Sequence, residues 1–268
     1  MLIVIKIGGD LIKEGLSPDL IEDIVATHKK HRIVIVHGGA DIVTEISTKL
    51  GHPPHFVTSP KGFKSRYTDR EESNIFTMVM AGLINKRIVA SLEGKGITSI
   101  GLSGIDCHLI KAVRKTQLVI KDETGKKKLI EGGYTGKITA INAEMLHQFL
   151  EEKILPIISP VALGEESELL NIDGDRVASS IASTLKADRM ILLTDTPGVK
   201  LNDAYVSKMS AYEAETALNK ISGGMVTKIY SAIEAVKHGV AEAQIASGKS
   251  EKPISKALSR EDCTTITK

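Results

Sequence analysis

Residues 3–9 read Ile3-Val4-Ile5-Lys6-Ile7-Gly8-Gly9, a β-branched apolar run that holds one lysine and ends in two glycines. A short, continuous apolar run of this kind is typical of a parallel strand that is covered on both faces. The opening stretch is therefore the first of six predicted strands. These strands cover residues 2–7, 33–36, 98–102, 155–158, 190–193 and 243–247.

Segments with the apolar spacing of an α-helix separate the predicted strands. Gly51, Gly94 and Gly239 follow three of these segments, at positions where glycine commonly ends a helix. Because strands and helices alternate, we expect an α/β fold with an open, mostly parallel central sheet sandwiched by helices. The predicted helices cover residues 17–31, 40–50, 71–93, 140–152, 175–186 and 223–238.

One stretch breaks the alternation and predicts a basic β-hairpin that stands off the sheet. Residues 116–120 and 128–130 read as its strands, on either side of the turn sequence Asp122-Glu123-Thr124-Gly125. Residues 111–137 contain eight Lys and Arg against three Asp and Glu, and residues 61–70 contain four against one. Such a concentration of charge marks either a solvated face or a docking surface for an acidic partner.

Length, composition, charge and cysteine content limit the classes of protein to which the chain can belong. The 268 residues are 42% hydrophobic and 25% charged, which is usual for a globular protein of one or two domains. A formal net charge of +2 gives no reason to expect nucleic-acid binding. Cys107 and Cys263 are too isolated to predict a zinc site or a disulfide framework. No secretion signal is recognisable and no apolar run approaches about 18 residues, so we expect a cytoplasmic protein outside the membrane.

Two glycine pairs follow the first two predicted strands. Gly8-Gly9 ends the first strand, and Gly38-Gly39 follows His37 at the end of the second. At the carboxyl ends of parallel strands, glycines let backbone N–H groups approach a ligand, and the N-terminus of the next helix adds positive potential. The pairs indicate either an anion cradle or simple tight turns, and neither matches the P-loop or dinucleotide-binding motif.

Two lysines and an aspartate are candidates for anion chemistry. Lys6 would lose hydration in a buried strand unless an anion met it, although in an edge strand it could reach solvent. Lys228 lies in the first turn of a predicted helix, where a cation opposes the helix dipole and a bound phosphate would reverse that effect. Asp175 is predicted as the N-cap of the helix 175–186, and its carboxylate could also hold the two lysines in place.

Six motifs follow one another along nearly the whole chain: K-x-G-G, H-G-G-A-D, R-Y-T-D, N-I-D-G-D, T-D-T-P-G-V and G-G-M-x-x-K. The fifth, at residues 194–199, is a turn by composition and a candidate nucleotide loop by position. In this order the motifs resemble the amino acid kinase family, and specifically its N-acetylglutamate kinase branch. The segment 62–69, G-F-K-S-R-Y-T-D, looks like those members that phosphorylate aminoadipate or glutamate attached to LysW, a small acidic amino-group carrier protein.

The resemblance implies the carbamate kinase-like fold and an ATP-dependent kinase that makes an acyl phosphate in lysine, or arginine, biosynthesis. Residues 1–165 would form the acceptor lobe and residues 166–268 the nucleotide lobe. Lys6 and Lys228 would neutralise the transferring phosphoryl group, Asp175 would orient both, and Mg²⁺ would be held through the ATP phosphates without protein ligands. The glycine pairs would donate N–H groups. The implied nucleotide and phosphate residues are Gly8, Gly9, Gly38, Gly39, Thr194, Asp195 and Gly198, and the implied acceptor residues are Arg66 and Asn171 with Gly38 and Gly39.

The resemblance also implies partners. An acidic carrier would dock on the two basic segments through Lys61, Lys64, Lys126, Lys127 and Lys128. The family suggests a homodimer with the helix 71–93 as candidate interface, although its Ile75, Met78, Val79 and Leu83 would equally serve a core.

Two departures from the family pattern concern the acceptor. Ala40 replaces a third glycine, and Asp173-Gly174 replaces Asn-Ala, which adds a negative charge near the acceptor. Free N-acetylglutamate remains the alternative substrate. A non-catalytic nucleotide-binding protein remains the alternative class, although such a protein would not need the pair of lysines.

Overall fold

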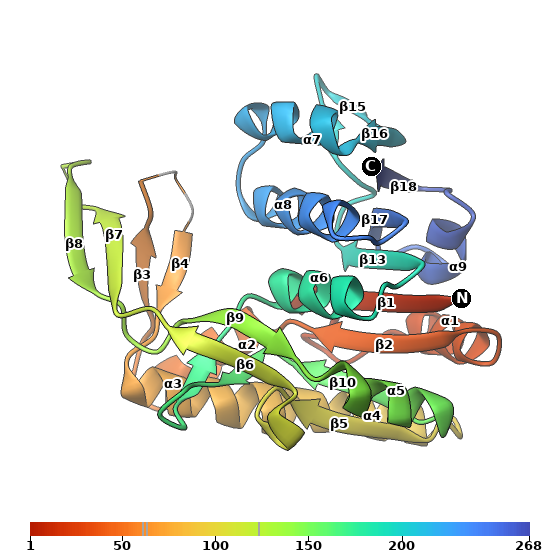
Figure 1. The fold of residues 1–268 in the computed structure, drawn as a ribbon, viewed down its shortest axis with the longest axis horizontal. Helices are drawn as coiled ribbons and strands as arrows, with labels where there is room; N and C mark the ends of the chain where they lie inside the picture. Colours follow the sequence, from red (N-terminus) through yellow and green to blue (C-terminus); the bar gives the residue numbers. More distant parts are fainter. Residues whose placement is uncertain (61, 63, 123) are drawn as a thin grey trace.

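The structure is a computed structural model that describes residues 1–60, 62, 64–122 and 124–268, and of Lys64 it describes the backbone only. The strands of its central sheet are β1 Leu2–Ile7, β2 Arg32–His37, β5 Ser99–Ser103, β10 Leu155–Ser159, β13 Arg189–Thr194, β16 Lys208–Ser210, β17 Glu242–Ser247 and β18 Cys263–Thr267. Among the described residues they form one eight-stranded sheet in the order β16-β18-β17-β13-β1-β2-β10-β5 (Figure 1). All pairs are parallel except β17 with β18. The predicted open, mostly parallel sheet is confirmed.

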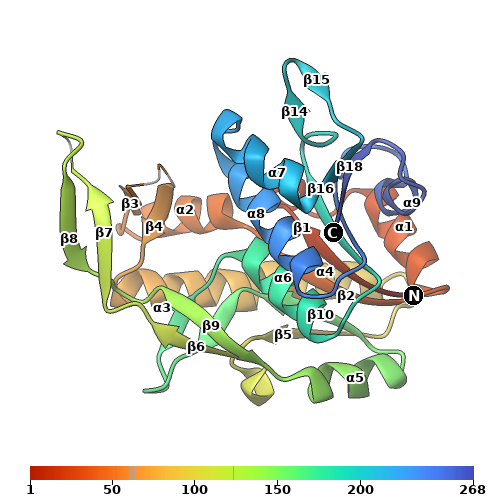
Figure 2. The same ribbon diagram turned by 45° about the horizontal axis from the view of Figure 1, so that its top comes forward.

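Helices cover both faces of this sheet. They are α1 Pro18–His28, α2 Ala40–Lys49, α3 Arg70–Thr77, α4 Asn85–Glu93, α5 Ala143–Glu151, α6 Gly174–Thr184, α7 Ala211–Ala217, α8 Gly224–Lys237 and α9 Pro253–Leu258. Along β1, Ile3, Ile5 and Ile7 enter the core that includes α1, α2, α4 and α9. Leu2 and Val4 enter the opposite core, with α6 and α8 (Figures 1 and 2). Because side chains alternate along a strand, Lys6 faces α6 and α8 as well.

A π-helical turn, Met78–Ile84, joins α3 and α4 into one continuous helix. By length and apolar composition alone this helix, Arg70–Glu93, could cross a membrane, so the expectation that no such run exists was wrong. Ile75, Val79 and further apolar side chains enter the core under the sheet. The helix is therefore a core helix of a soluble fold.

Two smaller sheets stand off the central one (Figure 1). The first contains β6 Ile110–Arg114, β9 Gly136–Ile141, β11 Val161–Leu163 and β12 Leu169–Asn171, in the order β12-β11-β6-β9. The second contains β3 His55–Thr58, β4 Lys64–Tyr67, β7 Gln117–Lys121 and β8 Lys127–Glu131, in the order β4-β3-β7-β8. A short hairpin in the second half pairs β14 Lys200–Leu201 with β15 Ala204–Tyr205.

These sheets confirm one prediction and correct another. The predicted basic hairpin is β7 with β8, which pair in antiparallel register. The predicted helix 140–152 begins too early, because residues up to 141 form β9 and the Asn142 side chain caps α5 by accepting a hydrogen bond from the Met145 N–H at 3.2 Å. The sequence pattern gave no sign of β3 and β4, which extend the hairpin into a four-stranded sheet.

The two halves of the chain share the central sheet. β13 pairs directly with β1, so the sheet continues from one half into the other. The division predicted after residue 165 falls between β11 and β12, which pair with each other. After β12, α6 crosses back over β1 and contacts α8. The border between an acceptor lobe and a nucleotide lobe stays a prediction.

Candidate active site

Asp175 bridges two lysines at the carboxyl end of β1. Its Oδ1 lies 2.8 Å from Lys6 Nζ, and its Oδ2 lies 3.3 Å from Lys228 Nζ. The side chains of Lys6, Asp175 and Lys228 are only 8%, 5% and 14% exposed. A buried ammonium group is costly unless a carboxylate or another anion faces it, so this bridge is what lets two cations stay in the interior.

The three residues come from three different elements. Lys6 lies in β1, which is hydrogen-bonded to β13 on one side and to β2 on the other. The strand is therefore central, and the alternative that Lys6 reaches solvent from an edge is wrong. Lys228 lies just beyond the first turn of α8, because that helix begins at Gly224. Its ammonium group is held by Asp175, which lies in α6.

Asp175 does not cap α6, which corrects the prediction. The helix begins one residue earlier, at Gly174, and Asp173 is the N-cap residue. Asp173 has extended backbone and its Oδ1 accepts a hydrogen bond from the Arg176 N–H at 3.0 Å. Capping by Asp173 leaves the Asp175 side chain free to turn toward the lysines from inside the first turn.

Contacts within the bridge shift the pKa values of Asp175 and Lys6 toward their charged forms. Burial alone would raise the pKa of Asp175, but the two ammonium groups outweigh burial and hold that pKa below its usual value. Burial alone would lower the pKa of Lys6, but the Asp175 carboxylate outweighs burial and raises it. At neutral pH the bridge thus contains one carboxylate and two ammonium groups. Its net positive charge is suited to an anionic ligand.

The two glycine pairs lie at the same end of the sheet, but only half of their N–H groups are free. The Gly8 N–H donates to Leu193 O at 3.0 Å, and the Gly38 N–H donates to Ile7 O at 2.8 Å. These two groups continue the sheet hydrogen bonding, so the expectation that all four glycines donate to a ligand was wrong. Within the described chain, the N–H groups of Gly9 and Gly39 donate no hydrogen bond.

Close approach explains why glycine occupies these two positions. A Cβ atom at Gly9 would lie 3.1 Å from the backbone nitrogen of Gly39. At Gly39, φ is +138° and a Cβ atom would lie 2.3 Å from Cδ1 of Ile84, in the π-helical turn. The two free N–H groups therefore belong to loops in direct contact, beside the lysine bridge. We call this group of donors and cations the anion cradle because it is chemically suited to an anion, and the binding of an anion there stays a prediction.

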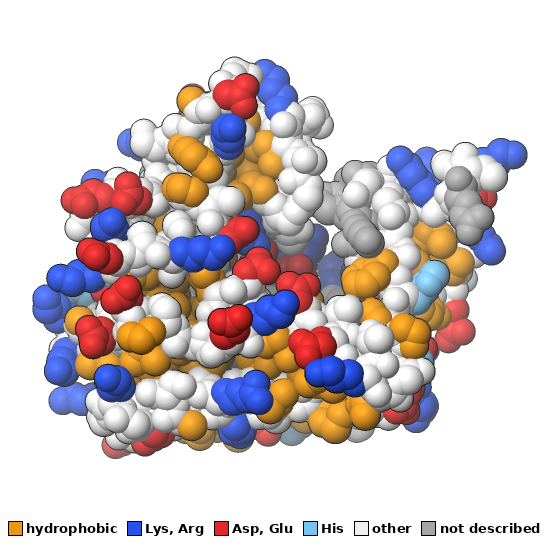
Figure 3. All heavy atoms as spheres, turned by 180° about the vertical axis from the view of Figure 1, so that it is seen from behind, with side chains coloured by type: hydrophobic (Ala, Val, Ile, Leu, Met, Phe, Trp, Pro, Cys, Tyr) orange, Lys and Arg blue, Asp and Glu red, His pale blue; other side chains and the backbone are white. Residues whose placement is uncertain are grey.

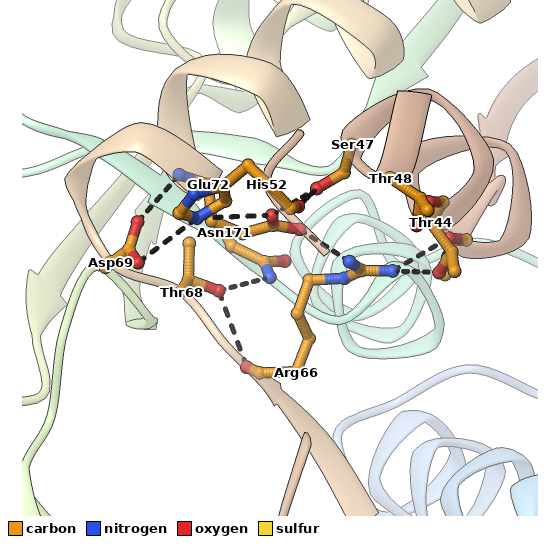
Figure 4. A network of polar contacts seen from close by, with 10 residues as sticks. Thr44, Ser47, Thr48, His52, Arg66, Thr68, Asp69, Glu72 and Asn171 are labelled. Carbon is orange, nitrogen blue, oxygen red and sulfur yellow. Dashed lines mark hydrogen bonds and ion pairs between the residues drawn. The ribbon is translucent and has the colours of Figure 1, made fainter. Parts of the chain in front are cut away.

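Arg66 is buried and already occupied by the protein (Figure 4). Its Nη1 donates to Glu72 Oε1 at 2.5 Å, and its Nη2 donates to Ala40 O at 2.9 Å and to Thr44 Oγ1 at 2.6 Å. Three of its five N–H donors are thus used, and a carboxylate ligand would have to share what remains. Glu72, 1% exposed, was missed because nothing in the sequence distinguishes it from its neighbour Glu71.

Asn171 lies in the same network as Arg66 (Figure 4). Its Nδ2 donates to Thr68 Oγ1 at 3.0 Å, and Thr68 is two residues from Arg66 at the end of β4. The structure therefore brings the two predicted acceptor residues together. Through Ala40, which follows Gly39, the network also reaches the anion cradle. Its role in binding an acceptor stays a prediction.

The predicted nucleotide loop follows β13, next to β1. A Cβ atom at Gly8 would lie 3.7 Å from Cα of Thr194, so this loop borders the anion cradle. Thr194 Oγ1 donates to Asp195 Oδ1 at 3.2 Å. Gly198 lies against β18, where a Cβ atom would come 2.5 Å from Thr264 Oγ1. Packing alone accounts for glycine at 198, and nucleotide binding by this loop stays a prediction.

The structure describes the side chains of three of the five predicted docking lysines. Lys61 and the side chain of Lys64 lie outside the described residues. Lys126, Lys127 and Lys128 are exposed, on the four-stranded extension whose outer end carries Lys and Arg side chains (Figure 3). Because Lys127 and Lys128 are consecutive in β8, their side chains lie on opposite faces of the extension.

No group of three or more His, Cys, Asp or Glu side chains that could hold a metal ion occurs in the part of the chain that the structure describes. Mg²⁺ bound through phosphate oxygens needs no such group, because Mg²⁺ usually keeps several waters. The expectation about Mg²⁺ stays a prediction.

Known proteins resemble the chain along its length. The model of the amino acid kinase family matches residues 1–247. A protein of Cenarchaeum symbiosum is 49% identical over 265 residues, which cover 99% of each chain. The LysW-aminoadipate/LysW-glutamate kinase of Metallosphaera sedula is 44% identical over 258 residues, which cover 96% of this chain and 97% of that one.

Solved structures share the fold. Carbamate kinase from Giardia lamblia bound to AMP-PNP superposes with a TM-score of 0.69 at 15% identity, over 99% of this chain and 98% of that one. N-acetylglutamate synthase from Neisseria gonorrhoeae, complexed with coenzyme A and N-acetyl-glutamate, has a TM-score of 0.79 at 23% identity, over 100% of this chain and 59% of that one. Both likenesses confirm the expected fold. With a family model matched over most of the chain and relatives 44–49% identical over nearly all of it, this protein belongs to the amino acid kinase family.

Proposed function

We propose that the protein transfers the γ-phosphoryl group of ATP to the side-chain carboxylate of aminoadipate or glutamate carried on LysW. The observation that carries the kinase chemistry is the buried bridge of Lys6, Asp175 and Lys228 beside the free N–H groups of Gly9 and Gly39. Membership of the amino acid kinase family implies the use of ATP. Full-length relatives that bear this name support the choice of acceptor.

The chemistry needs alignment and charge, not a general base. A glutamate-type carboxylate has a pKa of about 4.3 and is already ionised at neutral pH. One of its oxygens attacks the γ-phosphorus, the bond from that phosphorus to the β–γ bridging oxygen breaks, and ADP leaves with the electron pair. No proton moves. The remaining difficulty is repulsion between two anions, which cations and fixed N–H donors reduce.

Different residues of the site reduce the repulsion and align the reacting groups. Lys6 from β1 and Lys228 from α8 neutralise the phosphoryl oxygens, and Asp175 holds both ammonium groups in place and raises the pKa of Lys6. Gly9 and Gly39 donate their free N–H groups to the same oxygens. Thr194, Asp195 and Gly198 line the nucleotide side, where Mg²⁺ held through the ATP phosphates would offset their negative charge.

Arg66 and Asn171 orient the acceptor. Glu72, Thr44 and the Ala40 carbonyl fix the guanidinium of Arg66 (Figure 4), so its remaining N–H donors point in a set direction. Such a preset donor fits the α-carboxylate of an amino acid, and the Asn171 amide fits the linked amine.

Acyl-phosphate trapping tests the choice of acceptor. With ATP, Mg²⁺ and hydroxylamine, we expect hydroxamate from aminoadipate or glutamate carried on LysW, at a rate at least about tenfold above that from free N-acetylglutamate. The gain is expected because contacts with the carrier align the carboxylate before reaction. Hydroxamate from N-acetylglutamate alone would replace this proposal by the free acceptor. No hydroxamate from any of the three acceptors would favour a binding protein without kinase activity.

We further propose that the carrier docks on one face of the β7–β8 hairpin. Val119 and Leu129 are opposite one another on neighbouring strands and are 47% and 56% exposed. On the same face the next cross-strand pair outward is Lys121 with Lys127. An exposed apolar pair beside two cations suits an acidic protein, because the apolar pair supplies contact area and the lysines supply attraction.

A pair of charge reversals on adjacent residues tests the docking face. At low ionic strength we expect Lys127→Glu to weaken carrier binding by about tenfold, and more than Lys128→Glu, which alters the opposite face. Binding of the unchanged protein is expected to weaken with salt. Isothermal titration with LysW measures both effects. Equal effects of the two reversals, or binding indifferent to salt, would contradict the docking face.

The homodimer and the cytoplasmic location also remain proposals. Of the residues predicted for the dimer interface, Ile75 and Val79 are buried in the core, whereas Met78 is 54% exposed. Any interface along this helix would therefore use Met78 and not Ile75 or Val79. Light scattering of the intact protein determines the oligomeric state.

A further inference from the structure

His37 has no part in the mechanism above, yet its ring is completely buried and has a polar partner at both nitrogens. Nδ1 lies 2.9 Å from Gly38 O, and Nε2 lies 3.3 Å from Asn85 Nδ2. A carbonyl oxygen can only accept a hydrogen bond, and an amide NH₂ group can only donate one. The ring is therefore neutral, with its proton on Nδ1.

The surroundings of Asn85 fix the direction of its amide. Nδ2 lies 2.9 Å from Ile157 O in β10 and 3.4 Å from Leu102 O in β5. Two nearby carbonyls identify this atom as the nitrogen, and with one of its two hydrogens on Ile157 O and the other on His37 Nε2, Asn85 anchors His37 to β10. Burial lowers the pKa of His37 to about 4, and the nearby Lys6 contributes to the decrease. The ring consequently stays neutral throughout the physiological range of pH.

We infer that His37 is a positioning residue that aims the Gly39 N–H at the transferring phosphoryl group. Gly38 C=O and Gly39 N–H belong to the same planar peptide unit, and in the trans form they point in opposite directions. By donating from Nδ1 to Gly38 O, His37 fixes the direction of the Gly39 N–H. This N–H is one of the two free donors of the anion cradle, so the inference rests on the proposed function.

The loop needs such a restraint because two successive glycines allow its peptide plane to rotate. A second contact acts on the same loop: a Cβ atom at Gly39 would overlap Ile84, in the π-helical turn immediately before Asn85. Single π-helical turns are frequent at functional sites. The turn and the histidine thus hold Gly39 from two sides, one by packing and the other through the peptide plane.

Three variants separate positioning from stability. In His37→Leu the donor is lost, whereas in His37→Asn the amide nitrogen replaces Nδ1 and can still donate to Gly38 O. The control is Gln244→Met, in which an equally buried polar residue of β17 loses its hydrogen bond to Ala257 O. All three are expected to lower the midpoint of urea unfolding. Only His37→Leu is expected to lower kcat markedly, by about 10- to 100-fold, with KM for ATP changed less than about threefold.

The outcomes decide the inference. We expect His37→Asn to keep kcat within about fivefold of the unchanged protein, and ¹⁵N NMR to find the His37 proton on Nδ1 between pH 6 and 8. Equal losses of kcat in the Asn and Leu variants, a proton on Nε2, or a loss confined to KM would overturn it. Rates are compared on whichever carboxylate acceptor the protein phosphorylates, and the tautomer needs no acceptor. Failure of the carrier assignment therefore leaves this test intact.

Discussion

Replacement of Lys6 or of Lys228 by methionine is expected to lower kcat by about 10²- to 10³-fold while the Kd for ATP changes by less than about tenfold. Both ammonium groups are nearly buried and contact the same carboxylate, Asp175. When one of them is removed, neither water nor the remaining lysine can supply the lost positive charge. Negative charge on the phosphoryl oxygens is redistributed during transfer, whereas nucleotide binding uses many other contacts. Methionine keeps an unbranched side chain, so at position 6 the packing against Gly174 is retained.

The same helix offers a matched control for this prediction. Lys237 lies in α8 and pairs with Glu215 at 2.8 Å, but its side chain is 47% exposed. Lys237→Met is expected to leave kcat within about twofold, because exposed ion pairs contribute little. Single-turnover kinetics and equilibrium nucleotide binding measure the two quantities separately. A kcat within tenfold of normal in both active-site variants, or an equal loss for Lys237→Met, would contradict the assigned role.

Asp175→Asn is expected to create a new alkaline decline in kcat. In the unchanged protein the carboxylate raises the pKa of Lys6, so this lysine keeps its charge to a higher pH than an ordinary lysine does. Without the carboxylate, burial dominates and lowers that pKa below its ordinary value of 10.5. As pH rises, the variant then loses the Lys6 charge earlier than the unchanged protein does. Rates measured from pH 6 to 10 reveal the added ionisation.

The same change is expected to destabilise the fold by about 3–5 kcal/mol at pH 7, because it leaves two buried ammonium groups without a carboxylate. The sign follows from linkage. Lys6, with a raised pKa, contributes stability that is complete below about pH 10 and is lost as pH rises through its folded pKa. Asp175, with a lowered pKa, contributes stability that is complete above about pH 4 and is lost as pH falls through its folded pKa. Urea unfolding across this range measures the effect.

Glu242 supplies the control, because it bridges two cations far from the lysine bridge. Its oxygens lie 3.3 Å from Arg189 Nε and 2.6 Å from Arg260 Nη2, and its side chain is 12% exposed. Glu242→Gln is expected to lower stability without adding an alkaline decline to kcat. An identical rate profile for the two variants, or a flat profile for Asp175→Asn, would contradict the account of Lys6.

Six strands of the central sheet, β1, β2, β5, β10, β13 and β17, were predictable from their short apolar runs, whereas β16, β18 and the helices α7 and α9 were not predicted. Residues 2–7 are apolar apart from Lys6 and are buried on both faces, and this pattern does not depend on the rest of the fold. β3 and β4 were not predictable, because they are short and largely polar, and because β3, which pairs with β4, also pairs with β7 over 50 residues away in the sequence. The start of α5 was misplaced because the last residues of β9 continue an apolar spacing that also fits a helix.

The site shows a similar division. A lysine in a buried strand demands a counter-charge, so Lys6 could be identified from the sequence, and Asp175 and Lys228 then followed from the motifs. The sequence could not show which glycine N–H groups the sheet would use, because the register of β13 and β2 against β1 decides this. Nor could it show that Glu72 and Thr44 would occupy Arg66, or that Asn85 would anchor His37, since these partners meet only in the folded chain.

A crystal structure with MgADP, a planar metal fluoride in place of the phosphoryl group, and the carboxylate acceptor would test the central claim most directly. We predict that Nζ of Lys6 and Nζ of Lys228 both lie about 3 Å from fluoride ligands, with the acceptor oxygen in line with the leaving oxygen of ADP. Either ammonium group turned away from the fluoride, with the other alone in contact, would contradict it.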